Sequence, residues 1–151
     1  MAYLEWPNDL NTGIDIIDSQ HKRIVQYINE LHDAKQQNDH HLVGEVLGEL
    51  VDYTISHFAF EESLMEKAGY PFLDPHKRVH GLFVERVGAF VERHNQGEDV
   101  ADDLLYMLTK WLFNHIKSED RDYAQKVMHS MKDIRKEGSW LSRSLSKFFR
   151  S

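Results

Sequence analysis

Apolar side chains recur at steps of three and four residues through most of the chain, which is the spacing of one buried face of an α-helix. The clearest run extends from Val43 to Leu64, where the inward positions alternate steps of four and three. Similar runs that begin near Asp18, Asp74 and Asp102 predict three more helices. Because the loops between these runs are short, we expect consecutive helices to be antiparallel neighbours in an all-α, up-down-up-down four-helix bundle.

The expected ends of the helices follow from capping residues and helix breakers. After an N-terminal arm over residues 1–17, Asp18 is expected to cap the first helix. A Gly-Tyr-Pro sequence at residues 69–71 ends the second helix, and Asp74 with Pro75 is expected to supply a cap and a first-turn proline for the third.

The C-terminal segment 137–151 differs from the rest of the chain and is typical of a short amphipathic basic helix. Leu145 and Phe148 fall on one side of such a helix, and the basic residues lie elsewhere. A helix of this kind can make a weak contact with a membrane surface or a partner protein through residues 138–151, while packing back against the bundle is an equal alternative. We therefore expect a helical domain over residues 1–136 followed by an amphipathic tail.

Composition narrows the classes of function. The 25 acidic residues outnumber the 18 basic ones and give a net charge of −7, which argues against nucleic acid as a partner. The chain has no cysteine, which excludes disulfides, iron–sulfur clusters and thiolate metal sites. Its start lacks the pattern of a signal peptide, and no stretch is apolar enough to span a bilayer, so we expect a cytoplasmic protein. No pattern in the sequence fixes an oligomeric state.

Side chains of metal-binding type interrupt the apolar faces of all four expected helices: His21, His57, Glu61, His76, His80, His115 and Asp120. His57 and Glu61 are four residues apart, so both can point to one place in the core, and the two histidines of the third helix have the same spacing. A lone histidine in a helical core is more often hydrogen-bonded than metal-bound, and that remains the alternative for each residue. However, five histidines and two carboxylates would be very costly to bury without partners, and a metal cluster satisfies all of them.

The number of ligands indicates the kind of cluster. Seven protein ligands exceed the needs of one octahedral ion, but they suit two iron ions if both carboxylates and a solvent-derived oxo or hydroxo group bridge them. Three histidines then complete one iron at six ligands, and two leave the other iron at five with an open position. Dioxygen can bind at that position while the second iron supplies another electron, which favours reversible oxygen binding.

The same residues stand in motifs that resemble those of the bacterial hemerythrin family, over a region from Trp6 to about Val127. The matching motifs are Thr12-Gly13-Ile14-Asp15-x-x-Asp18-x-Gln20-His21, His57-Phe-Ala-Phe-Glu61, His76-Lys-Arg-Val-His80 and Trp111-Leu-Phe-Asn-His115-Ile-Lys-Ser-Glu-Asp120. The resemblance implies a six-coordinate iron held by His76, His80 and His115, a five-coordinate iron held by His21 and His57, and bridging carboxylates from Glu61 and Asp120.

The resemblance also implies an apolar oxygen pocket, formed by Ile24, Phe58, Trp111, Leu112 and Ile116. Ordinary core packing is an equally good interpretation of these five residues. Tyr123 is expected to pack against the bundle and, being close to Asp120, can also tune the site. The remaining histidines match no ligand position and are expected on the surface, the pair at 40–41 in a loop: His32, His40, His41, His94 and His129.

We therefore expect an oxygen-binding protein for storage, delivery or sensing, and not an enzyme. A signalling module that responds to oxygen, redox or iron status is the alternative. A di-iron oxidase is less favoured because the Glu-x-x-His motif of carboxylate-rich di-iron enzymes is absent. The absence of His-Glu-x-x-His argues against a zinc peptidase.

Overall fold

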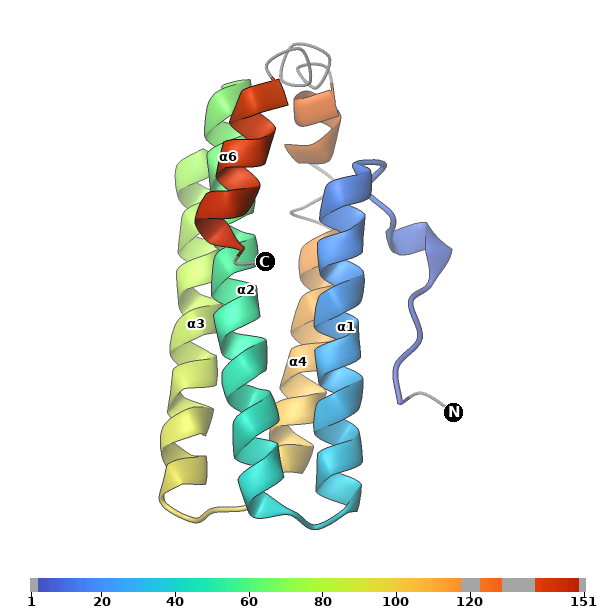
Figure 1. Cartoon of the computed structure of the whole chain (residues 1–151), viewed down its shortest axis with the longest axis vertical. Helices are drawn as coiled ribbons and strands as arrows, with labels where there is room; N and C mark the ends of the chain where they lie inside the picture. The colour runs from blue at the N-terminus through green and yellow to red at the C-terminus, as the bar shows by residue number, and fades with distance from the viewer. Residues whose placement is uncertain (1–2, 118–122, 129–137, 150–151) are drawn as a thin grey trace.

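The computed structural model describes residues 3–117, 123–128 and 138–149. Its long helices are α1 (Asp15–Gln36), α2 (His40–Ala68), α3 (Leu73–Asn95) and α4 (Ala101–His115), and they run side by side as a bundle (Figure 1). A short 3₁₀-helix, η1 (Asn8–Leu10), precedes them, and α6 (Gly138–Phe148) follows. The described residues contain no strand, and the all-α fold predicted from the sequence is confirmed.

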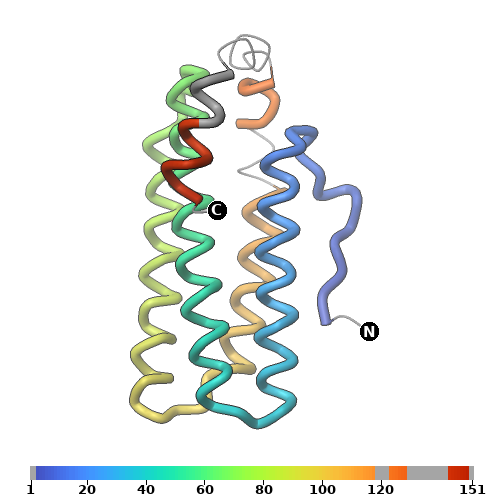
Figure 2. The backbone as a smooth tube through the Cα atoms, in the orientation of Figure 1, coloured from blue at the N-terminus to red at the C-terminus, as the bar shows by residue number. Residues whose placement is uncertain are grey.

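The turns between the four long helices lie at alternate ends of the bundle, so consecutive helices are antiparallel (Figure 2). Asn38 has a φ of 53°, which is the left-handed conformation that lets the chain turn back after α1. Asp39 then caps α2 by accepting a 3.0 Å hydrogen bond from the backbone N–H of Leu42. Gly69, with a φ of 70°, ends α2 at the break that the sequence predicts.

Two predicted helix caps were wrong. The first helix begins at Asp15, so Asp18 lies inside its first turn. The Asp18 carboxylate instead accepts hydrogen bonds from the backbone N–H groups of Thr12 and Gly13, at 2.7 and 3.2 Å, and thus fastens the N-terminal arm to α1. Phe72 occupies the cap position of α3, and Asp74 is the second residue of the helix. The helix therefore starts earlier than the position of Pro75 suggests.

The core is divided along the axis of the bundle into two apolar clusters. The larger cluster includes Ile24, Phe58 and Leu112, and the smaller one includes Ile17 and Leu64. On α1, buried Gln20 and His21 lie between Ile17 and Ile24, and on α2, buried His57 and Glu61 lie where the two clusters meet. The fold therefore places a buried polar layer between two apolar ones.

The tail packs against the bundle. Phe149 lies with its ring centroid 5.4 Å from that of Tyr53 and 6.0 Å from that of Phe60, both on α2. Leu145 and Phe148 also pack on the smaller apolar cluster. Of the two alternatives for this segment, packing on the bundle is the one that the structure contains. Among the described residues, no helix has the length and apolar character needed to cross a bilayer.

Two predictions about histidines outside the ligand set were wrong. His40 and His41 are the first two residues of α2 and not part of a loop, because the cap is the preceding aspartate. His94, predicted on the surface, is only 6% exposed. Its ring stacks on that of His40 with the centroids 3.8 Å apart, so these two histidines join α2 to α3 at the end of the bundle opposite α6 (Figure 1). His129 lies outside the described residues.

Candidate metal centre

Six of the seven predicted ligands meet in the polar layer, and they come from all four helices. Each of the six is at most 4% exposed: His21, His57, Glu61, His76, His80 and His115. Asp120 lies outside the described residues.

Glu61 stands at the middle of this cluster. His57 Nε2 lies 2.9 Å from its Oε1 atom, and His80 Nε2 lies 3.5 Å from the same oxygen. On the other side, His21 Nε2 lies 3.9 Å from Glu61 Oε2. Between α3 and α4, the Nε2 atoms of His80 and His115 are 3.2 Å apart. One carboxylate is thus within reach of nitrogen atoms from three different helices.

The cluster divides into two groups whose ligand atoms all lie within 4.8 Å of one another. One group joins Glu61 to His21 and His57, and the other joins it to His76, His80 and His115. A carboxylate shared by a pair and a trio of histidines fits two neighbouring ions. The nitrogen and oxygen donors are of the kinds that iron accepts, although other divalent transition metals accept them too.

Two polar side chains outside the predicted set orient the histidines. Gln20 Oε1 lies 2.7 Å from His57 Nδ1, and Glu62 Oε2 lies 3.1 Å from His80 Nδ1. Because amide and carboxylate oxygens accept hydrogen bonds, each Nδ1 carries the proton and each Nε2 lone pair points into the cluster. These two roles were not predicted from the sequence. The available signal was their position: Gln20 precedes His21 within the first motif, and Glu62 directly follows the second motif.

Tyr123 also reaches the cluster. Its hydroxyl donates a hydrogen bond to Glu61 Oε2, and its side chain is fully buried. The expectation that Tyr123 packs against the bundle is confirmed. Through this hydrogen bond the tyrosine acts on the carboxylate at the middle of the cluster.

Burial lowers the pKa of His80, and the nearby His115 and His76 lower it further. Its hydrogen bond to Glu62 and the charge of Glu61 oppose this shift without cancelling it. A histidine binds metal through a neutral imidazole, so the burial of His80 keeps it in the form that a ligand needs.

Aromatic rings cover one side of the cluster. Phe58 stacks on His80 with the centroids 3.8 Å apart, and Trp111 stacks on His115 at 4.4 Å. The other residues of the predicted oxygen pocket, Ile24, Leu112 and Ile116, are buried in the larger apolar cluster. All five predicted pocket residues thus belong to the larger apolar cluster or pack against it. Their role as an oxygen pocket stays a prediction.

The chain is similar to known proteins over most of its length. Residues 12–127 match the family model described as the hemerythrin HHE cation binding domain. The chain is 56% identical to a bacteriohemerythrin of Pseudomonas aeruginosa (strain LESB58) over 99% of both chains, and 51% identical to one of Stenotrophomonas maltophilia (strain R551-3) over the same shares. A solved structure of wild-type hemerythrin superposes with a TM-score of 0.79 at 30% identity, covering 83% of this chain and 98% of the other.

Proposed function

This chain belongs to the hemerythrin family, and on that premise we propose that it binds dioxygen reversibly at a non-haem di-iron centre. The observation that carries the proposal is the buried Glu61, shared between a pair and a trio of histidines from all four helices. The hemerythrin relatives and structural neighbours are oxygen-binding proteins and not enzymes, which agrees with the non-enzymatic role expected from the sequence.

We assign the trio His76, His80 and His115 to the six-coordinate iron, and the pair His21 and His57 to the five-coordinate iron. The division of the cluster into these two groups supports the assignment. Glu61 and Asp120 would bridge the ions together with an oxo or hydroxo group. When bound, the two irons supply the electrons with which dioxygen is held.

The protein's own residues would hold this site in shape and keep it dry. Gln20 and Glu62 keep their histidines oriented through hydrogen bonds to Nδ1. The stacked rings of Phe58 and Trp111, with the apolar residues behind them, exclude water from the cluster. Exclusion of water favours the release of unchanged dioxygen and disfavours its conversion to a reduced product.

The family match over residues 12–127 supports placing the oxygen-binding unit within 1–136, with 137–151 as an accessory tail. Storage, delivery and sensing all use the same reversible step. A cytoplasmic location stays a prediction of the sequence.

An anaerobic titration tests the proposal. The full chain is loaded with ferrous iron, oxygen is added in steps, and the visible absorption that develops is followed before and after purging with argon. We expect saturation at one dioxygen for two irons and return of the starting spectrum on purging. Absorption that decays to a ferric product without release of oxygen would contradict reversible binding and indicate an oxidase.

A further inference from the structure

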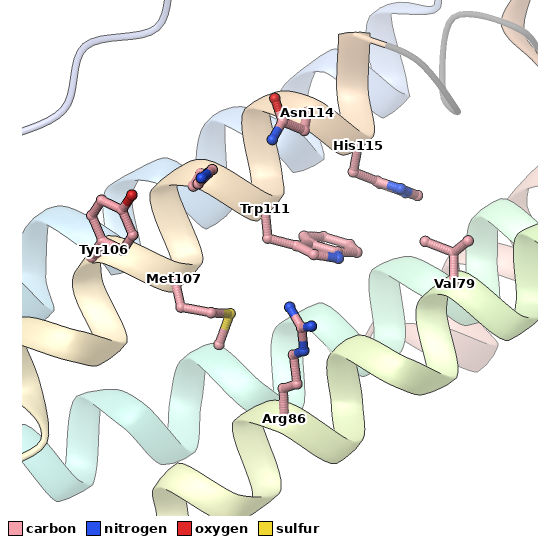
Figure 3. A pocket seen from close by; sticks show the side chains of 8 residues that line it. Val79, Arg86, Tyr106, Met107, Trp111, Asn114 and His115 are labelled. Atoms are coloured by element: carbon pink, nitrogen blue, oxygen red, sulfur yellow. The ribbon is translucent and has the colours of Figure 1, made fainter.

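A cavity of about 380 Å³ lies between α3 and α4, on the side of the cluster that includes His115. Arg86 enters it from α3, and Lys110 and Trp111 line it from α4. Figure 3 shows Arg86 extending toward the indole of Trp111, with His115 further along the same wall. Arg86 and Lys110 are exposed, so the cavity is accessible from solvent.

The polar groups of this cavity are suited to an anion. Two cationic side chains line it, and its lining includes no aspartate or glutamate. Within the part of the chain that the structure describes, neither Arg86 nor Lys110 forms an ion pair, and Lys110 instead lies 5.7 Å from the ring centroid of Tyr106. The indole N–H of Trp111 likewise has no hydrogen-bond acceptor among the described residues.

The charge of this cavity is opposite in sign to the net charge of the chain. The chain carries a net charge of −7, which would direct an anion away from most of its surface. Arg86 and Lys110, on facing helices and without an ion pair among the described residues, give this cavity a local positive charge. An arginine also presents a planar pair of donors that matches a carboxylate or a phosphate.

The other walls are suited to an apolar body. Val79, Tyr106 and Met107 line the cavity beside the cations, and the edge of Trp111 completes it. The volume lies within the range of roughly 300–1,000 Å³ that is typical of sites for small organic molecules. An occupant is therefore expected to combine an anionic head with an apolar part.

We propose that the α3–α4 cavity is a binding site for a small organic anion, such as an aromatic carboxylate or phosphate monoester. The head binds Arg86 and Lys110, and the ring lies against Tyr106 and Met107. The site is separate from the position for dioxygen, because that position is assigned to the iron of the His21 and His57 pair. Its wall includes His115, so an occupant lies beside the trio of histidines.

Calorimetric titration of the full chain with phenyl phosphate and with benzoate tests this site. Inorganic phosphate serves as the head alone and phenol as the body alone. We expect phenyl phosphate to bind at one site per chain, and both partial probes to bind at least about tenfold more weakly. No oxygen is involved, so the result does not depend on the outcome of the oxygen titration.

Two variants and one control locate the site. Arg86→Gln should weaken phenyl phosphate binding by about tenfold or more, and the additional change Lys110→Gln should abolish it. Lys77→Gln removes the same charge from α3 nine residues earlier, which is the opposite face of the helix, and should change the affinity by less than about twofold.

Three results would overturn the proposal. Phenyl phosphate and benzoate could both fail to bind, inorganic phosphate could bind as tightly as phenyl phosphate, or Lys77→Gln could weaken binding as much as Arg86→Gln. The second result would indicate an adventitious ion only, and the third a general effect of net charge. Circular dichroism of each variant checks that the bundle is intact.

Discussion

At the scale of single residues, the carboxylate of Glu61 has two kinds of partner. It is the shared member of both histidine groups, and it accepts a hydrogen bond from the hydroxyl of Tyr123. A buried carboxylate needs such partners because removing it from water is costly. In the metal-free chain the hydroxyl of Tyr123 is a donor to this carboxylate, and in the loaded chain the metal ions would provide much of the same stabilisation.

This difference leads to a prediction for Tyr123→Phe. Loss of the hydroxyl should lower the free energy of unfolding of the metal-free chain by about 1–3 kcal/mol, because a donor to a buried carboxylate is removed. The cost should be smaller in the iron-loaded chain, where Glu61 binds metal. Urea unfolding of both forms measures the two values.

Tyr27→Phe is the matched control for this substitution. Tyr27 is also buried, on α1, and its hydroxyl has no hydrogen-bond partner among the described residues. Tyr27→Phe should therefore lower the free energy of unfolding only slightly, with or without iron. Equal losses for Tyr123→Phe with and without iron would argue against a role of the tyrosine at the carboxylate.

His94 gives a prediction about pH. Burial lowers the pKa of His94, and the neighbouring His40 lowers it further. Its folded pKa therefore lies below the unfolded value of about 6.5, so the unfolded chain takes up the proton first as the pH falls. The contribution of His94 to stability is full above about pH 6.5 and is lost as the pH falls below that value.

Urea unfolding of the wild type and of His94→Gln between pH 7.5 and 5 measures this contribution. The variant should show a weaker fall in unfolding free energy toward pH 5, and the comparison cancels the histidines of the metal cluster, which both proteins share. Identical pH profiles for the two proteins would show that His94 takes up its proton equally in the folded and unfolded states.

At the scale of secondary-structure elements, the contact between α2 and α3 depends on a missing side chain. A Cβ atom at Gly44 would lie only 2.8 Å from Nε2 of His94, whereas nothing lies within 4 Å of such an atom at Gly48. Both glycines are within α2, one turn apart. They therefore form a matched pair in which helix propensity is the same and only the packing differs.

Gly48→Ala should raise the free energy of unfolding by about 0.5–1 kcal/mol, since alanine favours a helix over glycine and finds open space. Gly44→Ala should lower it by about 1 kcal/mol or more, because the clash with His94 outweighs the same gain. Urea unfolding at pH 7.5 compares the two. A stabilised Gly44→Ala variant would mean that His94 moves aside at little cost.

The elements also show what the sequence can and cannot predict. The helices were predictable because their apolar positions recur with the helical period, and Gly69 marks a break by its local conformation. The role of Asp18 was not predictable, because its carboxylate could either cap the helix or bind the preceding arm. Which of the two it does depends on how the arm folds back. The burial of His94 was hidden for a similar reason, since it requires a glycine on another helix.

The metal centre also has parts that the sequence could predict and parts that it could not. The ligand residues could be predicted because each replaces an apolar residue on an inward face, and the family motifs add their order. Gln20 and Glu62 could not be assigned in this way, since their partners are 37 and 18 residues away along the chain. Similarly, the hydrogen bond from Tyr123 to Glu61 spans 62 residues and appears only when the helices are assembled.

At the scale of the whole molecule, the polar layer interrupts the core between two apolar clusters. The six described ligands come from all four long helices, so an ion bound among them joins helices that are distant in sequence. A ligand that binds only the folded state stabilises that state in proportion to the logarithm of its concentration. Metal binding is therefore expected to stabilise the bundle as one unit and not a single helix pair.

Thermal unfolding at increasing concentrations of free ferrous iron, under argon, tests this expectation. The midpoint should rise with iron, and at about 100 times the dissociation constant the gain should be about 2.7 kcal/mol for each bound ion. His57→Gln should lose the part of this gain that comes from the ion of the His21 and His57 pair, because it removes a ligand of that ion. His41→Gln, which changes an exposed histidine on the same helix, should keep the whole gain. Loss of the gain in both variants would point to nonspecific binding by surface histidines. A separate early transition unaffected by iron would mean that part of the bundle unfolds independently of the layer, because only the two ions together would join all four helices.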